Sequence, residues 1–267
     1  MSAPALDAVV ERRATTHRLP IPLSRLIDVE SRKLVDTRSS RWLLAAVPLL
    51  TLIVVTGVTL WGREDEVTFG MHTTTNMMPL ELLLPLVAVL SVAGEWSQRA
   101  ALTTFALVPR RGRVMVAKAA ALLVVTLAAT VTVVVLSAIG TAVATRVRGI
   151  EAVWDLPLDL ALRLAVANVV VVAFGFGVGV AIRSTAPAMV AYLGFMFVVP
   201  MLSSVVAGLW TWWAENGPWF DLSWSTSFVT APEISGDQWA QLATSALLWI
   251  VLPTVLAVRR LLRVEIR

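Results

Sequence analysis

The chain has 267 residues, of which 57% are apolar and only 15% are charged. This composition excludes an ordinary soluble domain, because the apolar residues come in blocks of roughly 17 to 25, the length that crosses about 30 Å of hydrocarbon. The formal charge of +4 does not indicate nucleic-acid binding, since loops held on the cytoplasmic side of a membrane explain the excess of arginine. The absence of cysteine excludes disulfides and thiolate chemistry.

Residues 1–41 are expected to form a cytoplasmic tail that ends in an amphipathic helix. In the segment Leu23–Ser40 the apolar residues, among them Leu26 and Leu34, fall near one helical face. We expect this helix to lie in the membrane interface, and the alternative is a solvated linker helix. Its candidate contact residues are Glu30, Lys33 and Arg38. Glu30 lies close to the apolar stripe, and we expect it to pair with Lys33 or Arg38, or to reach a partner.

Six apolar segments follow and predict an all-α membrane protein whose transmembrane domain covers residues 42–258, with a basic tail over 259–267. The expected spans are Trp42–Trp61, Met78–Gly94, Ala119–Thr145, Leu162–Ile182, Ala188–Trp210 and Trp239–Val258. Both termini are expected in the cytoplasm, because this topology places 18 of the 22 lysines and arginines inside. The predicted location is the plasma membrane, crossed several times.

A few polar residues of the spans and outer loops are candidates for a substrate path. Glu81 should lie near the outer boundary, where its carboxylate reaches water, and Asn168 lies in an apolar span, where an amide must be hydrogen-bonded. Contact between helices is the competing role for Asn168. Trp212 and Trp213 belong to the tryptophan-rich segment Thr211–Gln238, which either gates a route or anchors the outer surface.

Catalytic and cofactor signatures are absent from the sequence. There is no GxxxxGK[ST] sequence, so no P-loop for ATP, and the two histidines, His17 and His72, form no ligand pair. No metal or cofactor is therefore predicted. The glycines at 175, 177 and 179 lie in an apolar span, and we expect them to let helices approach closely rather than to bind a dinucleotide.

The most polar interruption of the first half is Gly94–Lys118, which carries five basic residues against the single acid Glu95. Together with two other segments it resembles the ABC-2 type permeases, the membrane subunits of ATP-binding-cassette exporters. The three segments are VESRKLVDTRSSRWLL before the first span, Gly94-Glu95-Trp96 with Pro109-Arg110-Arg111 and Lys118, and GVGVAIRSTAPAMVAYLGFMFVVP. One departure is Gln98-Arg99-Ala100-Ala101, where members of that family often have Gly-Thr.

The resemblance implies a short coupling helix between spans two and three that docks on a cytoplasmic ATPase. Apolar residues near its centre, such as Leu102 and Phe105, fall on one helical face, and Pro109 ends the helix. The residues assigned to coupling are Glu95, Arg99, Leu102, Phe105, Pro109, Arg110, Arg111, Arg113 and Lys118. The arginines would face the ATPase or anionic lipid headgroups, or they act only as topology signals.

The resulting prediction is a permease without catalytic activity, which moves a hydrophobic or amphipathic substrate such as a drug, antibiotic or lipid-like molecule. Its expected partners are an ATPase subunit, which binds the ATP, membrane lipid and a second permease copy or paralogue. A membrane anchor or sensor that docks a cytoplasmic protein through residues 94–118 is the alternative. An intramembrane enzyme ranks third.

Overall fold

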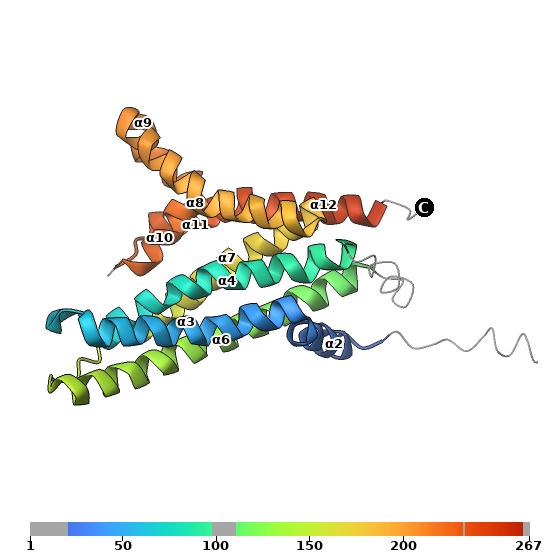
Figure 1. Ribbon diagram of the computed structural model, residues 1–267. Coiled ribbons are helices and arrows are strands. Elements are labelled where there is room, and N and C mark those ends of the chain that lie inside the picture. Colours follow the sequence, from blue (N-terminus) through green and yellow to red (C-terminus); the bar gives the residue numbers. More distant parts are fainter. Residues whose placement is uncertain (1–20, 98–110, 232, 264–267) are drawn as a thin grey trace, which may run out of the picture.

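The computed structural model describes residues 21–97, 111–231 and 233–263, which are helical and contain no strand (Figure 1). Six helical segments of this part are long and apolar enough to cross a membrane: Arg38–Trp61, Phe69–Ser97, Gly112–Arg148, Leu158–Ile182, Thr185–Leu209 and Gly236–Arg260. The prediction of an all-α protein with six membrane-length helices is therefore confirmed. The ends of each helix differ by a few residues from the ends of the apolar run that predicted it.

Helix α2 (Leu23–Asp36) precedes the first long helix, α3 (Arg38–Trp61). Figure 1 views α2 nearly end-on, so it runs across the axes of the long helices at one end of the bundle. Thr37 separates the two helices with an extended backbone, φ −73° and ψ 134°. Arg38 is consequently the first residue of α3, and its assignment to the amphipathic helix was wrong.

Helix α4 (Phe69–Ser97) begins nine residues before the span predicted at Met78. The preceding acidic turn is the short helix η1 (Glu64–Glu66). The stretch 69–77 contains several polar residues, which suggested an outer loop, but two of them, His72 and Asn76, are buried and contact α6. His72 Nδ1 lies 3.0 Å from Thr141 Oγ1, and Asn76 Nδ2 donates to Ser137 Oγ over 3.0 Å. Polarity here reflects contacts between helices and not exposure to water.

Three long helices follow: α6 (Arg111–Arg148), α7 (Leu158–Ile182) and α8 (Thr185–Leu209). Only Arg183 and Ser184 separate α7 from α8, which is a shorter turn than the five residues predicted. The segment after α8 contains the short helices α9 (Thr211–Asn216), η2 (Gly217–Trp219), α10 (Leu222–Ser227) and η3 (Phe228–Thr230). The last long segment is composite, with α11 (Gly236–Ala246), a π-helical stretch (Leu247–Val251) and α12 (Leu252–Arg263).

The centre of the fold is the pair α4 and α7, which make the most extensive contact of any two elements. Glycine permits this approach: a Cβ added at Gly175 would lie 2.6 Å from the carbonyl oxygen of Pro85, and one at Gly179 3.2 Å from that of Val89. Gly177 faces α12 through Thr254. The prediction that these glycines let helices approach closely is confirmed.

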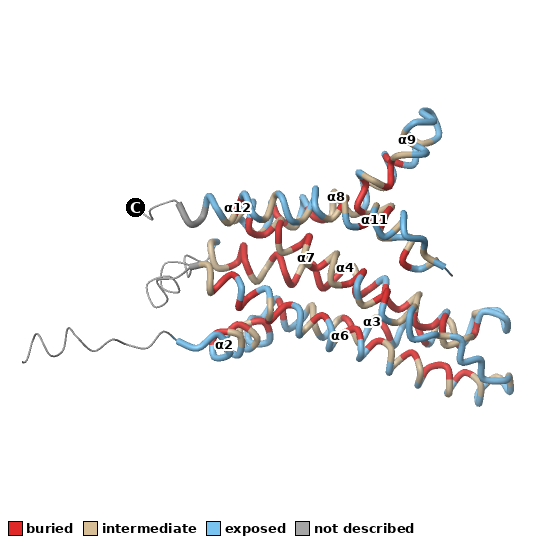
Figure 2. The backbone as a smooth tube through the Cα atoms, turned by 180° about the vertical axis from the view of Figure 1, so that it is seen from behind, coloured by how far each residue is buried: buried red, intermediate tan, exposed pale blue. Residues whose placement is uncertain are grey.

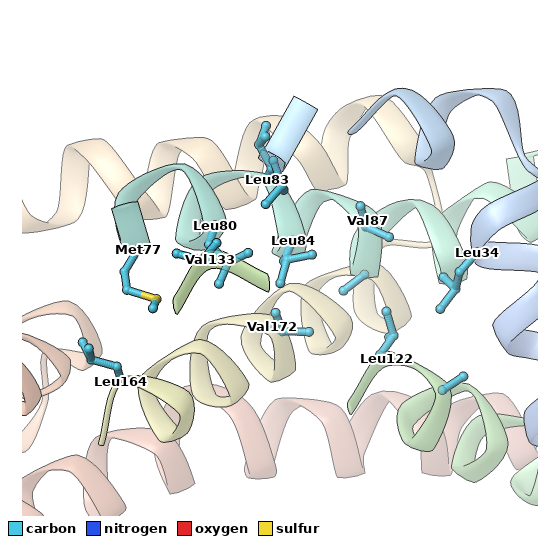
Figure 3. Close-up of a cluster of buried hydrophobic side chains, with 13 residues drawn as sticks. Leu34, Met77, Leu80, Leu83, Leu84, Val87, Leu122, Val133, Leu164 and Val172 are labelled. Carbon is cyan, nitrogen blue, oxygen red and sulfur yellow. The ribbon is translucent and has the colours of Figure 1, made fainter. Parts of the chain in front are cut away.

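One hydrophobic cluster extends along the bundle from Leu34 of α2 to Met77 and Leu164 near the other end (Figure 3). In Figure 2 the buried positions concentrate on α4 and α7, whereas α3, α8 and α12 present long exposed faces. Of the apolar window in α4, 61% is buried, against 11% in α8. Since these exposed faces are apolar, lipid or another membrane protein must cover them.

Candidate functional site

Four charged side chains meet at the end of the bundle where α2 lies. We call this end the α2 end; it comprises α2, the last turn of α4, the first turns of α6 and the Arg183–Ser184 turn (Figure 1). Glu30 and Lys33 come from α2, Glu95 from α4 and Lys118 from α6. Residues that were predicted separately for the interfacial helix and for coupling therefore belong to one site.

The four groups form a ring in which each ammonium contacts both carboxylates. Lys118 Nζ lies 2.5 Å from Glu30 Oε2 and 3.2 Å from Glu95 Oε1, while Lys33 Nζ lies 2.7 Å from Glu30 Oε1 and 3.0 Å from Glu95 Oε1. We call this ring the four-charge network. Two positive and two negative groups balance, as buried charges require.

Burial makes the network sensitive to the loss of its most buried members, Lys118 and Glu30. The side chains of Lys118 and Glu30 are only 3% and 5% exposed. Burial by itself raises the pKa of Glu30, but the charge of Lys118 and the hydrogen bonds from Lys118 and Lys33 outweigh it, and the net pKa lies below its ordinary value. Burial likewise lowers the pKa of Lys33, and contacts with Glu30 and Glu95 reverse the shift so that the net pKa is raised. Both shifts favour the charged forms.

Further polar contacts tie neighbouring elements of the α2 end together. Arg113 of α6 donates from Nη2 to the carbonyl of Ile21 over 2.6 Å, just before α2. Ser97, the last residue of α4, accepts from the backbone N–H of Thr185 at 3.1 Å and caps the start of α8. The guanidinium of Arg183 lies 5.3 Å from the ring centre of Trp96. α2, α4, α6 and α8 are thus connected by side-chain contacts at one end.

A cavity of about 630 Å³ lies beside the four-charge network, and all four of its members line it. The remaining lining includes Arg38 and several hydroxyl side chains. Of the two alternative partners expected for Glu30, Lys33 forms the ion pair, and Arg38 makes no ion pair with a described residue. In the part of the chain that the structure describes, no group of three or more His, Asp or Glu residues could hold a metal ion.

The apolar face of the predicted coupling helix lies outside the described residues. This applies to Arg99, Leu102, Phe105, Pro109 and Arg110. Arg111 is the first residue of α6. The described neighbours of this stretch, Glu95 before it and Lys118 after it, join directly through the four-charge network.

The residues predicted for a substrate path do not come together. Asn168 is buried and donates from Nδ2 to Thr130 Oγ1 over 3.3 Å, with Met77 Sδ at 3.2 Å, so it links α7 to α6 and α4. Trp212 and Trp213 lie on α9, beyond the far end of α8 (Figure 1), where Trp213 donates to Ser203 Oγ over 3.0 Å. Glu81, by contrast, lines a cavity.

Glu81 lies within α4, twelve residues after Phe69. Pro85 has no N–H, so the carbonyl of Glu81 lacks its usual donor four residues later. The hydroxyl of Tyr192, the only tyrosine in the chain, supplies this bond over 2.8 Å from α8. The prediction missed Tyr192, although a proline inside a span indicates an unsatisfied carbonyl four residues earlier that needs a partner.

A comparison of the sequence with models of protein families and with curated proteins finds no match.

Proposed function

We propose that the chain is the permease subunit of an ABC-2 type exporter in the plasma membrane, with both termini in the cytoplasm. A separate ATPase subunit would bind and hydrolyse ATP, and this chain would move a hydrophobic or amphipathic substrate. Two permease copies, or this chain and a paralogue, would assemble with two ATPases. The six membrane-length helices meet the basic requirement for such a subunit.

The observation that carries the proposal is the four-charge network. Residues 98–110, the proposed coupling helix, connect α4 to α6, and the network joins the ends of these two helices to each other and to α2. A force applied to residues 98–110 would therefore act on three helices together instead of bending one loop. Such a rigid connection is what a partner ATPase needs to drive rotation of helices.

The proposal predicts that a P-loop ATPase encoded beside this chain copurifies with the full chain and that Phe105→Asp uncouples the pair. A carboxylate in an apolar docking face loses its water without gaining a partner, so ATP hydrolysis stimulated by the permease should be lost. The measurement is the ATPase rate of the complex in proteoliposomes, with equal membrane insertion confirmed for both chains.

Thr103→Asp is the matched control, because position 103 lies about 160° from position 105 around a helix and receives the same charge. It should retain stimulated hydrolysis. Normal coupling in the Phe105→Asp variant would contradict the docking proposal. A stably bound partner without ATP-dependent flux in vesicles would instead favour the membrane anchor or sensor.

A further inference from the structure

A second cavity, of about 290 Å³, lies between the helix bundle and the segment that follows α8. Its walls come from α4, α7, α8, α10 and η3, and its volume is close to the lower limit of the roughly 300–1,000 Å³ typical of ligand pockets. Glu81, Phe174, Tyr192 and Phe195 line one part, and hydroxyl side chains such as Thr226 and Thr230 line another. We call it the Glu81 cavity. It is separate from the four-charge network, which lies at the α2 end.

The carboxylate of Glu81 is half-buried and forms no ion pair with any described residue. Its backbone carbonyl is occupied by Tyr192, but that contact leaves both carboxylate oxygens without a donor from the described chain. An ionised carboxylate among apolar groups is costly unless a cation or water compensates it. The cavity therefore offers a carboxylate whose charged form a bound cation would stabilise.

The aromatic wall of the cavity suits a cation with apolar substituents. The rings of Phe174 and Phe195 have centroids 4.2 Å apart, and those of Phe174 and Tyr192 are 6.2 Å apart. Aromatic ring faces attract cations, and they recognise ammonium groups whose apolar substituents would be poorly solvated in water. The hydrogen bond from the Tyr192 hydroxyl to the backbone carbonyl of Glu81 holds the ring beside the residue that carries the carboxylate.

We propose that the Glu81 cavity binds a small organic cation, a tertiary or quaternary ammonium, with its charge against Glu81 and its apolar groups against Phe174 and Phe195. This inference deepens the transport proposal by naming the class of cargo, and it rests on that proposal only for the step from binding to transport. The ammonium could belong to a free amphipathic molecule or to a choline headgroup, which share this chemistry.

The test uses the purified full chain in nanodiscs of phosphatidylglycerol and measures binding of benzyltrimethylammonium by equilibrium dialysis. Neopentylbenzene, its neutral isostere, is the competitor. The cation should bind, and the isostere should compete at least ten-fold less well, because only the charge distinguishes the two molecules. Equal competition by the neutral isostere would overturn the proposal. Loss of binding in phosphatidylcholine nanodiscs would identify the lipid headgroup as the occupant, whereas unchanged binding would identify a free cation.

Four variants locate the bound cation. Glu81→Gln should weaken binding at least ten-fold and Phe174→Leu several-fold, whereas Glu151→Gln, the same change at an exposed residue far from the cavity, should have no effect. Glu81→Asp keeps the charge and should keep measurable binding, which separates loss of charge from loss of folding. Unchanged affinity in Glu81→Gln would refute the site.

The two proposals fail in different ways. If the chain binds the cation but no ATPase copurifies, the Glu81 cavity stands and the exporter assignment falls. If the ATPase couples normally but the cation does not bind, the exporter assignment stands and its cargo is of another class.

Discussion

Lys118 shows how one residue connects distant parts of the chain. It lies in α6, yet its ammonium contacts Glu30, 88 residues earlier, and Glu95, 23 residues earlier. Its side chain is 3% exposed. A buried ion pair adds little net stability, but removal of one partner leaves the other charge buried and uncompensated. Lys118 is therefore the residue whose loss should damage the α2 end most.

We predict that Lys118→Met lowers the free energy of unfolding by about 3–5 kcal/mol, the usual cost of breaking a buried pair. The measurement is denaturant unfolding in mixed micelles, followed by tryptophan fluorescence. The matched control is Arg32→Met, because Arg32 pairs with Asp28 on the same helix α2 but both side chains are exposed, by 74% and 57%.

The control should change the free energy of unfolding by no more than about 1 kcal/mol. The double variant Glu30→Gln with Lys118→Met should recover part of the loss, because it removes the stranded charge. Equal effects of Lys118→Met and Arg32→Met would show that the four-charge network does not stabilise the fold.

At the scale of elements, Pro85 determines how α4 meets α8. The proline removes one hydrogen bond from α4, and Tyr192 of α8 replaces it across the helix interface. Gly175 of α7 allows close contact with Pro85 itself. Pro85 thus removes one hydrogen bond from α4, and contacts at the same place position α7 and α8 against it.

A double-mutant cycle tests this replacement. Tyr192→Phe should cost about 0.6–1.7 kcal/mol, between the average and the largest value measured for hydrogen bonds between membrane helices. In a Pro85→Ala background the same change should cost less, because an alanine at position 85 would restore the N–H donor within α4 while keeping the Cβ that faces Gly175. The readout is the free energy of unfolding in micelles. A Tyr192→Phe cost that is the same in both backgrounds would contradict the argument.

At the scale of the whole molecule, the bundle separates its loops into two groups. The described basic residues of α2, the start of α6, the Arg183 turn and α12 lie at the α2 end, and Arg63, Arg146, Arg148 and Arg163 lie at the other (Figure 1). Arg163 is buried there and donates to the carbonyls of Val229 and Ala231 over 3.0 and 2.7 Å. It holds the segment after α8 against the bundle.

The chain has no cysteine, so single cysteines report the topology directly. An impermeant maleimide should label Asp65→Cys and Asp237→Cys in intact cells, and Asp28→Cys and Ser184→Cys only after permeabilisation. All four positions are exposed. The fold requires that positions 65 and 237 behave alike and that 28 and 184 behave alike. From the excess of basic residues at the α2 end we expect the second pair to be cytoplasmic.

Labelling of Asp65→Cys and Ser184→Cys from the same side would contradict the arrangement of helices. Labelling of both pairs as expected but with the sides exchanged would contradict only the orientation.

The number of membrane-length helices and their approximate places follow from the sequence by itself, because the length of an apolar run is a local property. The amphipathic face of α2 is equally local, since Leu26 and Leu34 alternate with charged residues at helical spacing. The sequence also predicted that the glycines at 175 and 179 pack closely against another helix, because small residues in spans mark helix contacts.

Only the tertiary structure decided which polar groups meet. Nothing near Glu30 in the chain points to Lys118, and nothing near Glu81 points to Tyr192, because these partners come from helices far apart in sequence. The early start of α4 at Phe69 has the same origin: His72 and Asn76 belong in a helix because α6 supplies their partners. The position of a polar residue inside a membrane protein depends on its hydrogen-bonding or ion-pair partner. Local sequence patterns do not show which residues form such pairs.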